Sequence, residues 1–153
     1  MAKKSAGILL YRFKSDATEV FLVHPGGPFY KKKDMGVWSI PKGEFTEDED
    51  PLTAAKREFF EETGSELTGT FLALTPVRQN AGKYVYAWAV CGDLDEKQLR
   101  SNYFETEWPP KSGKIASFPE IDRGGWFMLA IAREKIISGQ AALLEELGKM
   151  LHA

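Results

Sequence analysis

The chain has 153 residues, 27% of them charged and 43% hydrophobic, and its formal net charge is −2. This length fits one domain over residues 1–153, and the near-neutral charge gives no reason to expect a nucleic-acid polymer or a membrane surface as partner. No apolar stretch approaches the length of a membrane span. The one cysteine cannot form an internal disulfide, so a reducing cytoplasm is the expected compartment, with the protein as a monomer or homodimer.

The first forty residues predict strands and a loop. Apolar runs at Ser5–Phe13 and Glu19–His24 indicate two strands joined by the polar turn Lys14–Thr18. The first run is too short for a signal peptide, so we expect a strand there. The loop Pro25–Gly36 follows, and Val37–Ile40 predicts a short strand leading into Pro41-Lys42-Gly43.

A helix between Asp50 and Gly64 is the clearest local prediction. Asp50 suits an N-cap, Pro51 suits the first helical position, and Gly64 suits the left-handed residue that ends a helix. An apolar stripe at helical spacing supports the assignment; it comprises Leu52, Ala55, Phe59 and Phe60.

The remaining chain predicts further strands and two helices. Thr70–Gln79 and Lys83–Cys91 indicate a hairpin around Asn80-Ala81-Gly82, and the apolar neighbours of Cys91 suggest a packed thiol. Gly92–Glu120 is the least regular stretch, which indicates a functional or disordered loop. A last strand at Trp126–Leu129 and helices at Ile131–Ser138 and Ala141–Leu151 complete an α/β chain, in which a mixed sheet is flanked by helices.

Three glutamates of the Asp50–Gly64 helix indicate a metal site. Glu58, Glu61 and Glu62 are spaced i, i+3 and i+4, so they share one face of the helix. Three neighbouring carboxylates repel one another, and a hard cation such as Mg²⁺ offsets that repulsion best. The alternative is a solvated acidic surface, which is common on helices.

The segment GEFTEDEDPLTAAKREFFEETG resembles the Nudix box of the Nudix hydrolases. The matching fixed positions are Gly43, Glu49, Arg57, Glu58, Glu61, Glu62 and Gly64, whereas Ser65 replaces the aliphatic residue that the family prefers there. The resemblance implies an α/β/α sandwich. It also implies Mg²⁺- or Mn²⁺-dependent hydrolysis of a nucleoside diphosphate linked to another moiety.

The resemblance also implies roles for the matching residues. Glu58 and Glu62 would be the principal metal ligands, and Glu61 would be a third ligand or act through a water. The backbone carbonyl of Lys42 would add a ligand, and Gly43 would let the chain pass close to the metal. Glu49 and Arg57 would brace the loop against the helix.

A further carboxylate is expected outside the box. Several Nudix enzymes place a glutamate six residues before a tryptophan, and Glu120 stands six before Trp126. We expect Glu120 to be a metal ligand or the general base. Glu105 and Glu107 are rivals, although simple solvation is the more common state of such residues.

Substrate-binding residues are less strongly marked. Lys42 beside the box and Arg78 on a strand could contact phosphates, and Tyr84 or Trp108 could stack on a base. The alternative for Tyr84 is packing within the hairpin. His24, before Pro25, fits a turn residue better than a catalytic base.

Three functions remain open at this stage. The segment WSIPKG, which runs into the box at Gly43, is similar to the corresponding segment of the Nudix branch that cleaves dinucleoside polyphosphates. Sugar-nucleotide and nucleoside triphosphate pyrophosphohydrolases are alternatives within the family. A non-catalytic nucleotide-binding regulator is the alternative from another class, but such relatives usually have eroded box glutamates.

Overall fold

The computed structural model describes residues 3–79 and 82–152. The strands are β1 (Lys4–Lys14), β2 (Ala17–Pro25), β3 (Lys42–Glu44), β4 (Leu72–Ala73), β5 (Val77–Arg78), β6 (Tyr84–Cys91), β7 (Tyr103–Glu107), β8 (Ile115–Pro119) and β9 (Ile121–Met128). The helices are α1 (Pro51–Thr63), α2 (Leu129–Lys135) and α3 (Ala141–Leu151), with 3₁₀ turns η2 (Glu96–Gln98) and η3 (Ser138–Gln140). Among the described residues, no helix is both long and apolar enough to cross a membrane.

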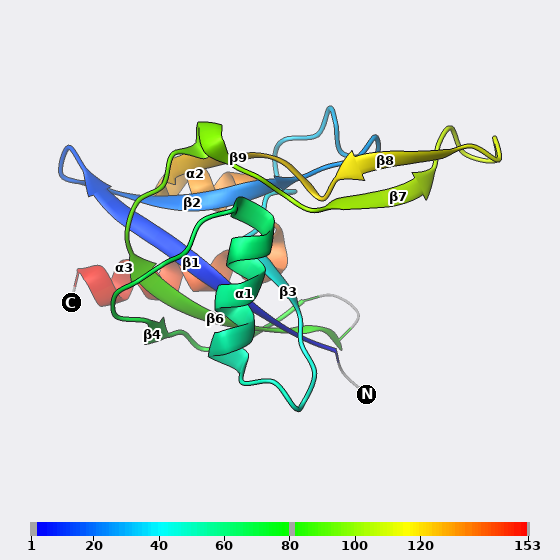
Figure 1. Cartoon of the computed structure of the whole chain (residues 1–153). Helices are drawn as coiled ribbons and strands as arrows, with labels where there is room; N and C mark the ends of the chain where they lie inside the picture. The colour runs from blue at the N-terminus through cyan, green and yellow to red at the C-terminus, as the bar shows by residue number, and fades with distance from the viewer. Residues whose placement is uncertain (1–2, 80–81, 153) are drawn as a thin grey trace.

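Seven strands form one mixed sheet. Its main path is β4-β6-β1-β2-β9, in which β1 and β6 run parallel and the other neighbours are antiparallel. The short strand β3 pairs with the start of β1, in the register Gly7↔Lys42. β1 is therefore central, and it holds β3 beside the face that α1 covers (Figure 1).

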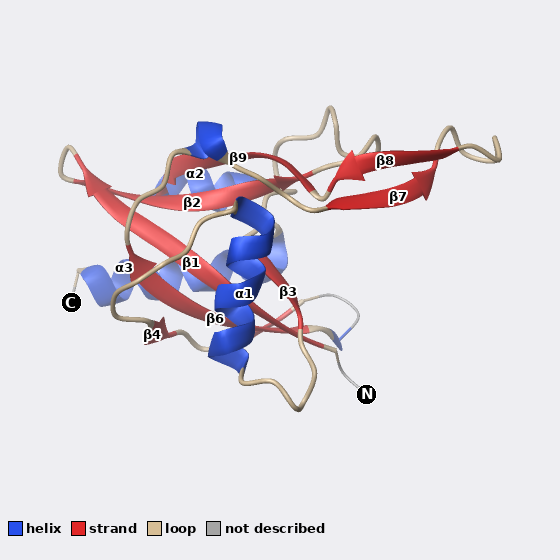
Figure 2. Cartoon of the chain, in the orientation of Figure 1, coloured by secondary structure: helices blue, strands red, loops and turns tan. Residues whose placement is uncertain are grey.

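Helices cover both faces of this sheet, as Figure 2 shows. Alternate residues of β1 point to opposite faces, because successive side chains of a strand alternate. Ile8 and Leu10 pack with Ala55 and Phe59 of α1, whereas Leu9 belongs to the second core, which α2 and α3 close. This arrangement confirms the predicted α/β/α sandwich with a mixed sheet.

The capping of α1 follows the sequence prediction closely. The Asp50 side chain accepts a hydrogen bond from Thr53 N, and Gly64 ends the helix at φ 79°, with its N–H donating to Phe60 O. The predicted apolar stripe is wrong at Phe60, which is 48% exposed. Ala54 and Thr63 are buried in its place, together with the predicted Ala55 and Phe59.

Several element predictions need correction. Val37–Ile40 is not a strand, because Trp38 and Ser39 form only isolated bridges. The arm Thr70–Gln79 contains just β4 and β5, and two residues of the predicted turn, 80 and 81, lie outside the described residues. The last strand begins at Ile121 rather than Trp126, and Cys91 is exposed rather than packed.

The largest error concerns Gly92–Glu120, which contains regular structure. β7 and β8 pair as an antiparallel hairpin, from Tyr103↔Pro119 to Glu107↔Ile115. In Figure 1 this hairpin extends away from the main sheet. Its residues are mostly exposed or half-buried, so the run lacks the apolar alternation that marks a strand on a core.

Candidate functional site

The acidic face of α1 lies against the turn that opens β3. Lys42 N donates a hydrogen bond of 3.2 Å to Glu62 Oε1. Gly43 lies so close to Glu58 that a Cβ built on Gly43 would be 2.5 Å from Glu58 Oε1 and closer still to Cδ and Oε2. A glycine is therefore required at position 43 for the Glu58 carboxylate to occupy its place.

Arg57 joins the loop before α1 to the acidic face. Its Nε and Nη2 donate to the two carboxylate oxygens of Glu49, at 2.9 and 3.0 Å. Its Nη1 donates to Glu58 Oε1 at 2.8 Å and reaches Glu61 Oε1 at 3.3 Å. These bonds raise the pKa of Arg57 above its ordinary value, so it stays charged. A bidentate pair of this kind fixes orientation as well as charge.

Burial raises the pKa values of two carboxylates on this face, Glu58 and Glu62. Burial raises the pKa of Glu62 to about 8, and the charge on Glu58 adds to this rise. The pKa of Glu58 is also raised, first by burial, although the hydrogen bond from Arg57 works against the rise. A buried carboxylate is more stable in its neutral form unless a cation lies beside it, so the acidic face of α1 favours binding of a cation.

Glu120 lies near the same face, although it is 58 residues from Glu62 in the chain. Its charge contributes to the raised pKa values of both Glu58 and Glu62. The backbone fixes its position, because Glu120 N donates to Asn102 O and Glu120 O accepts from Gly26 N, both at 2.8 Å. The loop after β2 and the hairpin thus bring Glu120 toward α1.

The rival glutamates lie on the β7–β8 hairpin. The Glu107 carboxylate accepts hydrogen bonds from Lys111 N at 2.8 Å and Gly113 N at 3.2 Å. It therefore holds the turn of the hairpin. Glu105 is exposed and stands opposite Ser117 in the ladder. Neither residue is among the charges that perturb Glu58 or Glu62.

The donor set suits a hard divalent cation. Carboxylate oxygens and backbone carbonyls are the ligands that Mg²⁺ takes, and the space that Gly43 leaves open keeps the Glu58 carboxylate beside the β3 turn. Within the described residues, no three acidic, histidine or cysteine side chains yet stand close enough together to hold an ion. Because Arg57 Nη1 contacts both Glu58 and Glu61, we expect these side chains to reorient when a metal binds.

The predicted substrate residues lie in three places. Lys42 is half-buried beside Glu62, and burial lowers its pKa. Arg78 lies 6.0 Å from the centre of the Tyr84 ring, and the two residues are paired across β5 and β6. Trp108 is elsewhere, next to the hairpin, with its ring 5.4 Å from that of Phe29.

Sequence reasoning missed a polar pair near Trp108, in which a buried histidine contacts a partly exposed aspartate. His24 is fully buried in β2 rather than placed in a turn. Its Nδ1 is 2.8 Å from Asp122 Oδ1, and its Nε2 is 2.6 Å from the Lys33 carbonyl oxygen. The available signal was the position of His24 at the end of an apolar strand, where a polar side chain needs a partner.

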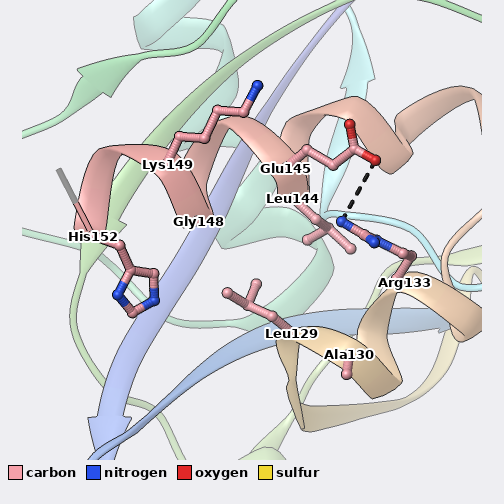
Figure 3. A pocket seen from close by; sticks show the side chains of 8 residues that line it. All are labelled: Leu129, Ala130, Arg133, Leu144, Glu145, Gly148, Lys149 and His152. Atoms are coloured by element: carbon pink, nitrogen blue, oxygen red, sulfur yellow. Dashed lines mark ion pairs between the residues drawn. The ribbon is translucent and has the colours of Figure 1, made fainter.

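A separate cavity of about 510 Å³ lies between α2 and α3, behind the sheet (Figure 3). Leu129 and Leu144 line it, and Arg133 and Glu145 form an ion pair of 3.5 Å beside them. α1 lies on the opposite face of the sheet (Figure 1). This cavity therefore contains none of the carboxylates of α1.

Comparison with known proteins agrees with this geometry. The NUDIX domain family model matches residues 1–147, whereas no curated protein sequence matches the chain. A C. elegans Ap4A hydrolase in a binary complex is similar, at TM-score 0.67 and 23% identity over 99% of this chain and 98% of that one.

Two further structures share the fold at lower identity. The NUDIX domain of Shewanella oneidensis NrtR, complexed with ADP ribose, has TM-score 0.68 and 17% identity over 99% of this chain and 89% of its own. A MutT studied in Aliivibrio salmonicida and Vibrio cholerae has TM-score 0.56 and 17% identity, covering 94% and 92%. With the box residues gathered on α1 and β3 and a family match over nearly the whole sequence, this chain belongs to the NUDIX family.

Proposed function

We propose that this protein is a metal-dependent hydrolase of a phosphoanhydride bond in a nucleoside diphosphate linked to another moiety. The observation that carries the proposal is the fit of the Glu58 carboxylate over Gly43, with Glu62 held by Lys42 N. A solvated helix would not need a bare backbone opposite its acidic face. Family membership supports the same reaction class.

The residues have distinct roles in this proposal. Glu58 and Glu62 would hold Mg²⁺ or Mn²⁺, together with Glu61, the Lys42 carbonyl and Glu120. When bound, such a metal neutralises phosphate oxygens and lowers the pKa of a coordinated water. Among these carboxylates, Glu61, Glu62 and Glu120 are the candidates for taking a proton from the attacking water.

The protein also supplies the cationic groups that a phosphate chain needs. The Lys42 ammonium lies beside the acidic face and is half-buried, where a charge contact is stronger than in water. Arg57 would remain a structural brace, because both ends of its guanidinium are already engaged by carboxylates. Gly43 would keep the approach to the metal open.

The proposed substrate is a dinucleoside polyphosphate. Such a molecule has a base at each end, and the structure has aromatic residues on two separate elements. Tyr84 begins β6 next to Arg78, and Trp108 follows β7. The fold is shared with the C. elegans Ap4A hydrolase, which is consistent with this choice.

A second candidate function is nucleotide binding without catalysis. The fold likeness to the NrtR domain complexed with ADP ribose favours it. All three box glutamates are present here, which a binding module does not require. We place the enzyme in the cytoplasm, on the basis of its lone cysteine.

A substrate panel tests the proposal. The protein is incubated with Mg²⁺ and dinucleoside polyphosphates, sugar nucleotides or nucleoside triphosphates, and the products are identified by phosphorus NMR. We expect Glu61→Gln and Glu62→Gln to lower turnover by orders of magnitude without unfolding the protein. Glu47→Gln is the matched control, because the Glu47 side chain is 85% exposed. Turnover near the wild-type rate in both box variants would refute the assignment.

A further inference from the structure

A hollow of about 400 Å³ lies where the β7–β8 hairpin meets the loop after β2. It is separate from the acidic face of α1 and combines apolar walls with two charged groups. Residues lining it include Gly27, Lys31, Trp108, Phe118, Pro119 and Asp122. Small-molecule sites are typically mostly apolar, with a few polar groups that set the orientation of the ligand.

Aromatic contacts hold the walls of the hollow in place. The Trp108 ring packs edge-on against Phe29, and the Phe118 ring lies 6.1 Å from that of Phe104. Phe104 in turn fits over Gly27, where a Cβ would lie 2.8 Å from its Cζ. The loop and the hairpin therefore contact each other through these aromatic rings.

Asp122 supplies one oriented acceptor to this hollow. Its Oδ1 faces His24 Nδ1 at 2.8 Å, and His24 itself is fully buried. His24 Nε2 must donate to the Lys33 carbonyl, since a carbonyl oxygen only accepts. A proton lies between Nδ1 and Oδ1 whichever group carries it, so Oδ1 is occupied. Asp122 Oδ2 has no hydrogen-bond partner in the part of the chain that the structure describes.

The wall of the hollow adjoins Glu120 along the chain. Pro119 lines the hollow and Glu120 follows it directly. Gly26 N donates to Glu120 O at 2.8 Å, which ties the loop wall to the same residue. Lys31 is exposed at the hollow, where its ammonium can meet a phosphate.

We propose that this hollow binds the base of the substrate nucleotide, and that Asp122 Oδ2 accepts a hydrogen bond from the amino group of a purine such as adenine. The inference rests on the proposed function for the identity of the ligand as a nucleotide. It adds Asp122 as a specificity-determining residue, with His24 as the positioning residue that leaves one carboxylate oxygen free. A ring without an amino group would not make this hydrogen bond, so its affinity is expected to be lower.

The test compares AMP with purine riboside 5′-monophosphate, which lacks only the amino group. Binding is measured by calorimetry in EDTA, so that neither metal nor hydrolysis contributes. The wild-type protein is expected to bind AMP about tenfold more tightly, because AMP makes one hydrogen bond to Asp122 Oδ2 that the analogue lacks. Equal affinity for the two nucleotides would overturn the role of Asp122.

Two variants complete the test. Asp122→Ala should remove the preference for AMP while leaving the affinity for purine riboside 5′-monophosphate unchanged. The unchanged affinity for the analogue would also show that the variant is folded. Trp108→Ala should weaken both ligands about tenfold, because stacking does not depend on the amino group. Tyr103→Ala is the matched control, since Tyr103 is 68% exposed on the same hairpin and does not line the hollow. Unchanged affinity in Trp108→Ala would overturn the site.

The result is separable from the proposed hydrolysis. If no substrate of the panel is hydrolysed in Mg²⁺ but AMP binds more tightly than purine riboside 5′-monophosphate in EDTA, the enzyme proposal fails and the base pocket is supported. If a dinucleoside polyphosphate is hydrolysed while AMP and its analogue bind equally, only the pocket assignment fails.

Discussion

The Gly43→Ala substitution tests how α1 and β3 build the acidic site. A Cβ at position 43 would overlap the carboxyl end of Glu58, at 2.5 Å from Oε1 and closer to the other two atoms. The three nearest atoms all belong to the flexible Glu58 side chain. The backbone at Gly43 is not left-handed, so alanine is allowed there once Glu58 has moved.

The expected effect is therefore large on activity and small on stability. Overpacking typically costs about 1–3 kcal/mol, and we expect the lower end because the obstructing group can rotate away. Displacing a metal-binding carboxylate by about 1 Å can cost a hundredfold in rate. We predict that kcat/KM for the best substrate of the Mg²⁺ panel falls about 100-fold or more, while Tm falls by only a few degrees.

A double-mutant cycle separates this cause from a general disturbance. In a Glu58→Ala background the obstructed carboxyl group is absent, so adding Gly43→Ala should change kcat/KM less than about threefold. Gly148→Ala on α3 is the matched control, because its Cβ would make only an ordinary contact of 3.7 Å with Leu129. Multiplicative losses from Gly43→Ala and Glu58→Ala would show that the glycine does not act through Glu58.

Three further predictions follow from the same site. Burial raises the pKa of Glu62 to about 8 in the folded protein without metal. Protonated Glu62 therefore contributes to the free energy of unfolding at low pH, and this contribution is lost as the pH rises through 8. Thermal melts in EDTA should therefore show a lower Tm at pH 8.5 than at pH 6. Mg²⁺ should raise the Tm more at pH 8.5, because protons no longer compete with the metal for Glu62. Neither trend is expected in Glu62→Gln. Arg57→Ala should lower Tm modestly and turnover more strongly. Arg57→Lys should not restore turnover, because lysine cannot make the bidentate pair with Glu49. Restored turnover in Arg57→Lys would show that Arg57 acts only through its positive charge. Glu120→Gln should slow steady-state turnover more than Glu107→Gln, and the reverse order would transfer the role to the hairpin.

Local signals were enough to predict α1 and its box residues. Asp50, Pro51 and Gly64 mark both ends of the helix within the segment itself, and the observed caps use the same groups. The positions of Glu58 and Glu62 on one face then follow from helical geometry alone. The relation of that face to Gly43 was anticipated only through the family resemblance, because it depends on how β3 pairs with β1.

The β7–β8 hairpin could not be predicted, for a physical reason. Its two strands pair only with each other within the described sheets, so neither needs a continuous apolar face. Phe104 contacts the loop after β2 at Gly27, and it packs against Phe118 within the hairpin. Two aromatic residues fourteen positions apart leave no periodic trace in the sequence. Backbone hydrogen bonds to Asn102 and Gly26 place Glu120, and Asp122 and Trp108 line one hollow beside the hairpin.

The failed strand at Val37–Ile40 shows why the lead into the box resists prediction. The run is apolar and Ile40 is fully buried, which favours a strand on pattern alone. Ile40 N, however, donates to Gln140 Oε1 at 3.0 Å instead of to a neighbouring strand. Gln140 is itself fully buried and also donates to Ser39 Oγ at 3.0 Å and Gln79 Oε1 at 3.1 Å. A side chain one hundred residues away thus holds the segment that leads into Lys42. The position of the candidate metal-binding turn therefore depends on η3, just before α3.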